Sequence, residues 1–234
     1  GLARHAPPAL PPRPMQELVT SLSRSLAQSP LLYAADIEGF SSKAQIQLRL
    51  AVATLHERIS LGYVRRCHGD LHLGNIVLWH GHPVLYDAIE FDESIATIDT
   101  LYDLAFLLMD LDQHQQRRAA NEIFNRYFWL ANDKMDLRGL RALPLFLGVR
   151  ASVRAVVSAD RAAQEQGKAS QDGTERARAY LQAGIAYLDP LPPELIAIGG
   201  LSGTGKTTLA AALAPARGAA PGAIHVRSDL ERKS

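Results

Sequence analysis

Apolar residues recur at helical spacing over most of the first 189 positions of the chain. The segment 41–62 begins with a serine that can cap a helix and ends at Gly62, a residue type that favours helix ends. Pro144 lacks a backbone donor and should bend or break the helix in which it lies. Helices are therefore expected at 15–28, 41–62, 98–113, 115–132, 137–166 and 173–188.

Two other patterns interrupt or follow these helices. Residues 75–79, NIVLW, and residues 83–87, PVLYD, are short apolar runs around the turn HGH, which predicts a hairpin. After the proline-rich stretch 189–195, the pattern changes to strand, loop and helix. The apolar run LIAIGG predicts a strand, a glycine-rich loop follows it, and a helix at 207–214 precedes a final strand at 223–229.

The pattern divides the chain into three parts. Residues 1–14 contain the run PPALPPRP and are expected to form an extended linker, because proline fixes φ and removes donors. Residues 15–189 form a mostly helical lobe with a few short strands, and residues 194–234 form the start of a second domain. The expected fold class is α+β, followed by the start of an α/β domain.

Composition adds limits on partners and location. The chain is 47% hydrophobic and 21% charged, and its net charge of +1 gives no electrostatic reason to expect a nucleic acid partner. No apolar run reaches the roughly 18 residues of a membrane helix, so no membrane partner is expected. The single cysteine, Cys67, excludes an internal disulfide and fits a reducing, cytoplasmic location. The chain begins at Gly1 with no signal-peptide pattern, and we expect it to be a fragment.

The stretch CHGDLHLGN at 67–75 contains the first group of candidate catalytic residues. Asp70 and Asn75 have the spacing H-x-D-x-x-x-x-N, and Asp87 follows the predicted hairpin. Phosphoryl transfer needs a group near the acceptor hydroxyl, together with carboxylates or amides that bind Mg²⁺. His68 is expected to orient the loop through its ring hydrogen bonds, and Gly69 to keep it tight. A lone HGD turn is usually structural, but three matching segments in order favour a functional site.

These segments, HGDLHLGNIVL, LYDAIEFD and IDTLYDLAFLL, resemble the aminoglycoside phosphotransferase family, which has a kinase-like fold. The resemblance covers residues 15–189, which would correspond to a kinase C-terminal lobe. It implies that Asp70 is the catalytic base, that Asn75 and Asp87 bind Mg²⁺, and that Asp103 is a buried brace for the loop. The family does not fix the phosphate acceptor.

The same resemblance raises two further points. Glu90 and Asp92 lie near the metal carboxylate in sequence and are weaker candidates. Kinases also need an N-terminal lobe whose strand-borne lysine contacts the nucleotide phosphates. The residues before Asp70 are mostly helical and proline-rich, and Lys43 begins a helix, so we expect this lobe to be absent and the chain to be inactive by itself.

The stretch GLSGTGKT at 200–207 matches G-x-x-x-x-G-K-[ST], a phosphate-binding P-loop of the NTPase type. Backbone N–H groups of such a loop bind phosphate oxygens, and the next helix directs its positive end at them. Gly203 and Gly205 allow close approach, Lys206 would reach the β- and γ-phosphates, and Thr207 would bind Mg²⁺. The alternative is a structural glycine turn before a helix. The candidate phosphate-binding residues are Gly200, Gly203, Thr204, Gly205, Lys206, Thr207 and Thr208.

The last segment, HVRSDLERK at 225–233, resembles the second strand of small P-loop kinases. That resemblance makes Asp229 a candidate base or acceptor-binding group. Helix capping by Ser228 or Asp229 is an equally good interpretation. A Walker B carboxylate and further strands would lie beyond Ser234, so we expect only the opening part of this domain.

The sequence thus predicts an ATP-dependent phosphotransferase with ATP and Mg²⁺ as cofactors. Its expected partners are a nucleotide and a small-molecule hydroxyl acceptor of unspecified identity. The whole resembles fused bacterial proteins in which an aminoglycoside-phosphotransferase-like domain precedes an ATP-binding domain. Two other hypotheses remain open: a non-catalytic kinase-like binding module, and activity that resides in the P-loop domain alone.

Overall fold

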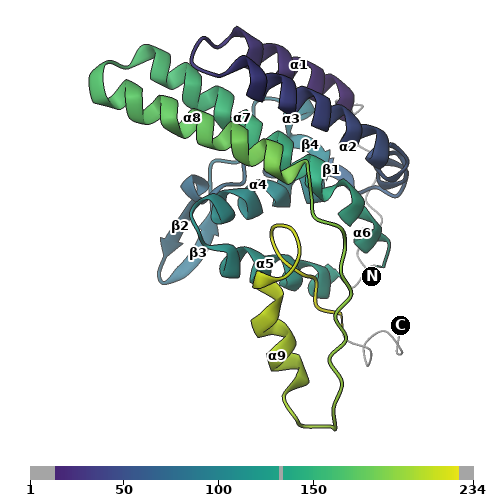
Figure 1. The fold of residues 1–234 in the computed structure, drawn as a ribbon. Helices are drawn as coiled ribbons and strands as arrows, with labels where there is room; N and C mark the ends of the chain where they lie inside the picture. Colours follow the sequence, from purple (N-terminus) through teal and green to yellow (C-terminus); the bar gives the residue numbers. More distant parts are fainter. Residues whose placement is uncertain (1–13, 132–133, 227–234) are drawn as a thin grey trace.

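Helices form most of the computed structural model, which describes residues 14–131 and 134–226. Figure 1 shows α7 and α8 side by side, with α1 and α2 along one side of them and α4 along another. The helices are α1 (Met15–Gln28), α2 (Ala34–Ser60), η1 (Leu73–Asn75), α3 (Glu93–Ala96), α4 (Thr100–Gln113), α5 (Arg117–Ala131), α6 (Lys134–Arg138), η2 (Gly139–Ala142), α7 (Leu143–Gln164), α8 (Gly167–Tyr187), α9 (Lys206–Leu213) and η3 (Ala214–Ala216).

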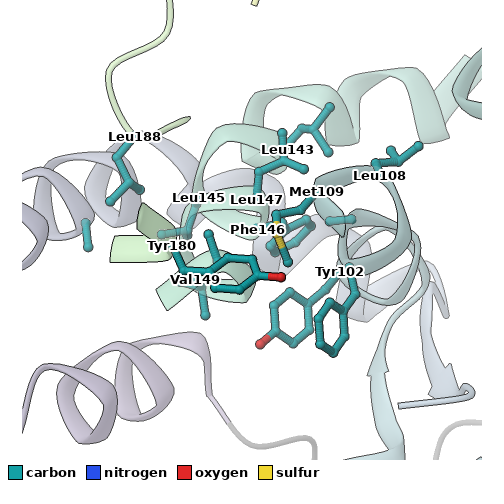
Figure 2. Packing of buried hydrophobic residues seen from close by; sticks show 14 of the residues in the cluster. Tyr102, Leu108, Met109, Leu143, Leu145, Phe146, Leu147, Val149, Tyr180 and Leu188 are labelled. Carbon is teal, nitrogen blue, oxygen red and sulfur yellow. The ribbon is translucent and has the colours of Figure 1, made fainter. Parts of the chain in front are cut away.

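The core of the helical lobe lies where α4 packs against α7. Helix α4 is buried from Leu101 to Leu111 without an exposed position, because nearly all of its residues are apolar. Figure 2 shows side chains of α4 and α7 meeting there, and the rings of Tyr102 and Phe146 lie 5.5 Å apart. Burial of so much apolar surface is the main stabilising contribution to a domain of this kind. The predicted mostly helical α+β class is therefore confirmed.

Four short strands form two separate pairs. The predicted hairpin is present as β2 (Ile76–Trp79) and β3 (His82–Leu85), with Trp79 opposite His82. The two turn residues, His80 and Gly81, both have positive φ, as a type I′ turn requires. A second antiparallel pair joins β1 (Val64–Arg66) to β4 (Thr97–Asp99). Sequence patterns missed this pair because a three-residue strand contains too little alternation to recognise.

Several helix boundaries differ from those predicted. Helix α2 begins after Tyr33 rather than at the serines of 41–62, which lie inside it. Helix α8 begins at Gly167, six residues before the predicted start. The predicted helix 137–166 is divided into α6, η2 and α7, as Pro144 indicated. Pro144 occupies the first turn of α7, where its missing N–H has no intrahelical partner to lose.

The α/β unit predicted for residues 194–234 is the part of the prediction that differs most from the structure. Helix α9 forms as expected, but the described residues of 194–226 contain no strand, so the strands predicted at LIAIGG and at 223–229 are wrong over that range. A strand needs a neighbour to pair its backbone groups, and neither segment pairs with the other here. Residues 1–13, most of the predicted linker, and Asp229 lie outside the described residues.

The segment that follows α9 is attached to α5 instead of to a sheet. Asn125 accepts a hydrogen bond from the backbone N–H of His225 and donates one to the carbonyl of Ala223. Asn121, one turn earlier, donates to the same carbonyl at 2.9 Å. Arg117 at the start of α5 donates to the carbonyl of Pro215. The yellow segment of Figure 1 accordingly lies against α5.

One stretch, Asp136–Gln164, is long and apolar enough to cross a membrane by length and composition. Of its most apolar 18-residue window, 67% is buried inside the protein, as in a core helix. Its apolar character therefore follows from its central place between α4 and α8.

A buried ion cluster connects α2, α4 and α6. The guanidinium of Arg58, 1% exposed, donates from Nε to Asp99 Oδ2 at 2.6 Å and from Nη2 to Asp99 Oδ1 at 2.8 Å. Its Nη1 donates to Asp136 at 2.7 Å. Asp99 also caps α4 by accepting the N–H of Leu101. Two carboxylates and one guanidinium leave the cluster with an excess negative charge, and burial raises the pKa of Asp136 although Arg58 opposes the shift.

We expect Asp99→Ala to lower the free energy of unfolding by about 3–5 kcal/mol, because it leaves a buried guanidinium without its two-oxygen partner. Asp136→Asn keeps an oxygen that faces Arg58 and removes the excess charge, so its cost should stay below about 1 kcal/mol at pH 7. Urea unfolding at pH 7 measures both values. A larger loss for Asp136→Asn than for Asp99→Ala would contradict this assignment of charge.

The pH dependence of stability follows from the raised pKa of Asp136. Because the folded state takes up this proton at a higher pH than the unfolded chain, the group favours folding increasingly as the pH falls towards the ordinary carboxyl range. Asp136→Asn should lack that contribution. The difference between the two proteins is read from urea unfolding curves between pH 7 and pH 4.

Candidate functional site

Two carboxylates of α4 bind the start and the middle of the loop 67–75. Asp103 accepts hydrogen bonds from the backbone N–H groups of His68 at 3.1 Å and Gly69 at 3.0 Å. Asp110, two turns later on the same helix face, accepts the N–H of Leu73 at 2.9 Å. Both carboxylates are buried. The predicted contacts of Asp103 with the loop are therefore confirmed.

Arg150 of α7 supplies the positive charge beside Asp103. Its guanidinium lies 3.9 Å from the Asp103 carboxylate and donates to the carbonyl of Gly69 at 3.1 Å. It also stacks on the ring of Tyr102, 3.9 Å from the centroid. Burial raises the pKa of Asp103, while Arg150 and the two backbone donors act in the opposite direction. The loop backbone is thus bound by an acid from α4 and a base from α7.

Asn75 is tied directly to Asp70. Its Nδ2 donates to the carbonyl oxygen of Asp70 at 2.9 Å and to the Asp70 carboxylate at 3.0 Å. Asn75 is buried, whereas the Asp70 side chain is 43% exposed. Because Nδ2 is the donor atom, these two bonds fix the amide orientation and direct Oδ1 away from Asp70. The amide oxygen is then the atom that a cation could contact.

The segment that carries Asp87 is bound to the loop on both sides of that residue. Tyr86 donates its N–H to the carbonyl of Asn75 at 3.1 Å, and Ile89 donates to the carbonyl of His68 at 2.9 Å. His68 Nε2 lies 2.9 Å from the carbonyl oxygen of Tyr86, so the expected ring hydrogen bond of His68 is present. Asp87 has a φ of 59° and an exposed side chain.

Gly69 is required where the loop meets this segment. Its φ is 84°, and a Cβ there would lie 2.9 Å from the side chain of Ile89. A side chain at this position would therefore push the Asp87 segment away from the loop.

The weaker candidates are arranged differently. Asp92 caps α3 by accepting the N–H groups of Ser94 and Ile95, and the bonds to Ser94 lower the pKa of Asp92. Glu90 is exposed on the connection between Ile89 and that cap. Within residues 14–131 and 134–226, no group of three or more His, Cys, Asp or Glu side chains is placed to bind a metal. A cation at Asn75 and Asp87 would have few protein ligands and would keep bound water, as Mg²⁺ commonly does.

The glycine-rich loop before α9 adopts backbone angles that only glycine takes readily. Gly203 and Gly205 have φ values of 79° and 78°, and Gly205 precedes the helix without any side chain capping its first N–H groups. The ammonium group of Lys206 folds back to the carbonyl of Leu201, as does the Thr204 hydroxyl at 2.8 Å. The start of α9 therefore has no side-chain cap at its N-cap residue, Gly205.

The remaining P-loop candidates have less support. Gly200 has a φ of 152°, which L-residues rarely adopt, and a Cβ there would lie 3.0 Å from the hydroxyl oxygen of Thr204. Thr207 and Thr208 are exposed in the first turn of α9. A hollow of about 480 Å³ lies between residues 193–198, one face of α9 and residues 223–226, and it includes Lys206 and Thr207 in its wall.

Proteins similar to this chain occur in mycobacteria. Uncharacterized proteins from Mycobacterium tuberculosis and Mycobacterium bovis are each 32% identical to this chain over 162 residues, which is 69% of the chain. The match covers 31% of each relative, so the chain spans less than a third of the length of these curated relatives. No protein-family model and no solved structure matches the chain.

Three residues near the loop were missed by the sequence analysis: His72, Asp110 and Arg150. Asp110 could have been found from its place in an apolar helix, since a buried charge needs a partner. Arg150 lies in a run of helical arginines, and nothing in its spacing separates it from exposed members. His72 belongs to the motif itself, but its contacts depend on the three-dimensional course of the loop.

We expect Asp103→Ala to cost about 3–5 kcal/mol of stability, because two loop N–H groups lose their acceptor and the buried Arg150 guanidinium loses its neighbouring negative charge. The amides of His68 and Gly69 should exchange with solvent much faster. Hydrogen exchange measured by NMR tests this, with Asp160→Ala on the exposed face of α7 as the control. Unchanged protection of both amides in Asp103→Ala would contradict the role of this carboxylate.

Cys67 should react slowly in the folded protein. Its Sγ lies 3.5 Å from the carbonyl oxygen of Ile98, and burial, followed by the charges of Asp103 and Asp99, raises the pKa of the thiol to about 12. At pH 8 the thiolate population should be about a thousandfold below that of an ordinary thiol. Alkylation with iodoacetamide, followed by mass spectrometry, is expected to be slow when folded and rapid in urea. Equal rates would contradict the raised pKa.

Proposed function

We propose that this chain carries the catalytic lobe of an ATP-dependent phosphotransferase of the aminoglycoside phosphotransferase type, with Mg²⁺–ATP as phosphate donor. The observation that carries the proposal is the double hydrogen bond from Asn75 to Asp70, which places the two motif residues in one rigid loop. Such a loop supplies what phosphoryl transfer needs, namely positioning and charge stabilisation.

Each residue has a role in this proposal. Asp70 presents a partly exposed carboxylate to the acceptor hydroxyl and would take its proton as general base. Asn75 and Asp87 would bind Mg²⁺ through an amide oxygen and a carboxylate, and both donor types suit this hard cation. The metal, when bound, would neutralise charge that develops on the transferred phosphoryl group. Asp103 and His68 would stabilise the loop conformation through their hydrogen bonds to the backbone.

The segment around Gly203, Gly205 and Lys206 is proposed as a second phosphate-binding element. Support comes from the positive φ values and from the uncapped start of α9, since such N–H groups attract phosphate oxygens. Lys206 would have to leave the carbonyl of Leu201 to reach a β- or γ-phosphate. Thr207 and Thr208 would assist from the first turn of α9, with Thr207 on Mg²⁺, as in P-loops generally.

The acceptor is proposed only as a small molecule that carries a hydroxyl group. The rival hypothesis is a non-catalytic binding module. It predicts that substitution of Asp70 or Asp87 leaves the binding of a nucleotide or a partner unchanged. The experiment below separates the two.

Calorimetric titration of the 234-residue chain with ATP and Mg²⁺ tests the proposal. We expect binding that requires Mg²⁺ and weakens at least about tenfold in Asp87→Asn, because a ligand to the cation is lost. Lys206→Ala should remove a separate, weaker binding contribution. Turnover should be low, since no strand-borne lysine precedes Asp70 among the described residues.

Any turnover should fall by a factor of about 10²–10⁴ in Asp70→Asn while Mg²⁺–ATP affinity stays unchanged, as expected of a general base. Asp160→Asn, far from the loop on the exposed face of α7, is the control. ATP binding that is insensitive to both Mg²⁺ and Asp87→Asn would favour the binding module. Loss of all binding in Lys206→Ala would place the nucleotide at the glycine-rich loop alone.

A further inference from the structure

His72 lies between Asp70 and the turn that leads to Asn75. Its Nδ1 accepts the backbone N–H of Gly74 at 3.0 Å, and its Nε2 lies 3.3 Å from the Asp70 carboxylate. The ring is largely buried and packs against Phe106 of α4, with centroids 5.2 Å apart. These contacts involve both ring nitrogens, and only one of them serves the local turn.

The bond from Gly74 determines which nitrogen carries the proton. A nitrogen that accepts an N–H must have a free lone pair, so Nδ1 is unprotonated in this arrangement. In the neutral imidazole the proton is then on Nε2, the atom that faces Asp70. The ring proton of His72 therefore lies on the nitrogen that is 3.3 Å from the Asp70 carboxylate.

The two oxygens of Asp70 have different surroundings as a result. Oδ2 receives Nδ2 of Asn75 at 3.0 Å and faces Nε2 of His72 at 3.3 Å. Neither contact involves Oδ1. The Asn75 hydrogen bond and the adjacent His72 ring restrict rotation of the carboxylate and leave the other oxygen to meet an incoming hydroxyl.

The backbone on either side of His72 is also fixed. The next residue, Leu73, donates its N–H to the buried carboxylate of Asp110, and the N–H of His72 is bonded to the carbonyl of Asp70 at 3.1 Å. Phe106, from the same helix as Asp110, supports the ring face. The imidazole therefore has little freedom to turn away from Asp70.

We propose that His72 is a positioning residue, whose Nε2–H orients the Asp70 carboxylate so that its Oδ1 faces the acceptor hydroxyl. This inference rests on the proposed phosphotransferase function, because it assigns Asp70 the role of base. A residue that only caps the η1 turn would need Nδ1 and would make no use of Nε2. The two roles can therefore be separated by substitution.

Two variants test the proposal. His72→Asn keeps an acceptor near Nδ1 for the Gly74 N–H but lacks a donor that reaches Asp70, whereas His72→Gln carries an amide donor at about the distance of Nε2. We expect kcat for phosphoryl transfer to fall at least about tenfold in His72→Asn, with KM for ATP unchanged, and to recover in His72→Gln to within about threefold of wild type. His56→Asn, on the exposed face of α2, is the control.

Imidazole ¹⁵N NMR of the 234-residue chain gives a readout that needs no turnover. We expect the His72 proton on Nε2 and a change in that N–H signal in Asp70→Ala, while the Gly74 amide signal stays in place. Full kcat in His72→Asn, or an Nε2–H signal that does not respond to Asp70→Ala, would overturn the positioning role and leave His72 as a cap. A wild-type chain that does not bind ATP in a Mg²⁺-dependent manner would count against the proposed function, and the spectra would still decide the positioning role.

Discussion

The buried carboxylate of Asp103 is the contact on which the site depends. It lies in a helix that is buried from Leu101 to Leu111 and accepts two N–H groups from the loop 67–75. Without these donors and the nearby Arg150, a charge in that position would be strongly unfavourable. The core therefore requires the loop in its observed position, and the loop cannot leave without exposing a buried acid. Stability of the lobe and geometry of the site are consequences of the same contact.

Helix α4 also binds the loop at a second point, because Asp110, two turns after Asp103, accepts the N–H of Leu73. The two acids bind the start and the middle of the loop, and the residues between them, from Asp70 to His72, are fixed at both ends. Asn75 and the segment around Asp87 are then added by hydrogen bonds to the same backbone. The partly exposed carboxylate of Asp70 thus lies on a loop whose backbone is bound by buried side chains. Such support suits a group whose orientation toward a substrate must stay constant.

The sequence predicted those parts of the structure whose signals are local. Helical periodicity located α1, α4, α5 and α9 to within two residues, and the HGH turn located the hairpin. The place of Asp103 also followed, since a charge among apolar residues needs a partner. The contacts of Arg150 and His72 did not follow, because they depend on α7 and α4 meeting the loop from segments distant in the chain. The strands expected in LIAIGG and at 223–229 failed for a related reason: an apolar run becomes a strand only beside another strand.

The glycine-rich segment is consequently positioned by side chains and not by a sheet. Asn121 and Asn125 bind the backbone of Ala223 and His225, and Arg117 binds the carbonyl of Pro215, so residues that follow α9 are fixed to α5. Helix α5 in turn packs against α4, which holds the loop 67–75. A movement of α9 that displaced the Pro215–His225 segment would have to break these hydrogen bonds. The two candidate phosphate-binding elements therefore share one support, in which α4 holds the first and α5 holds the second.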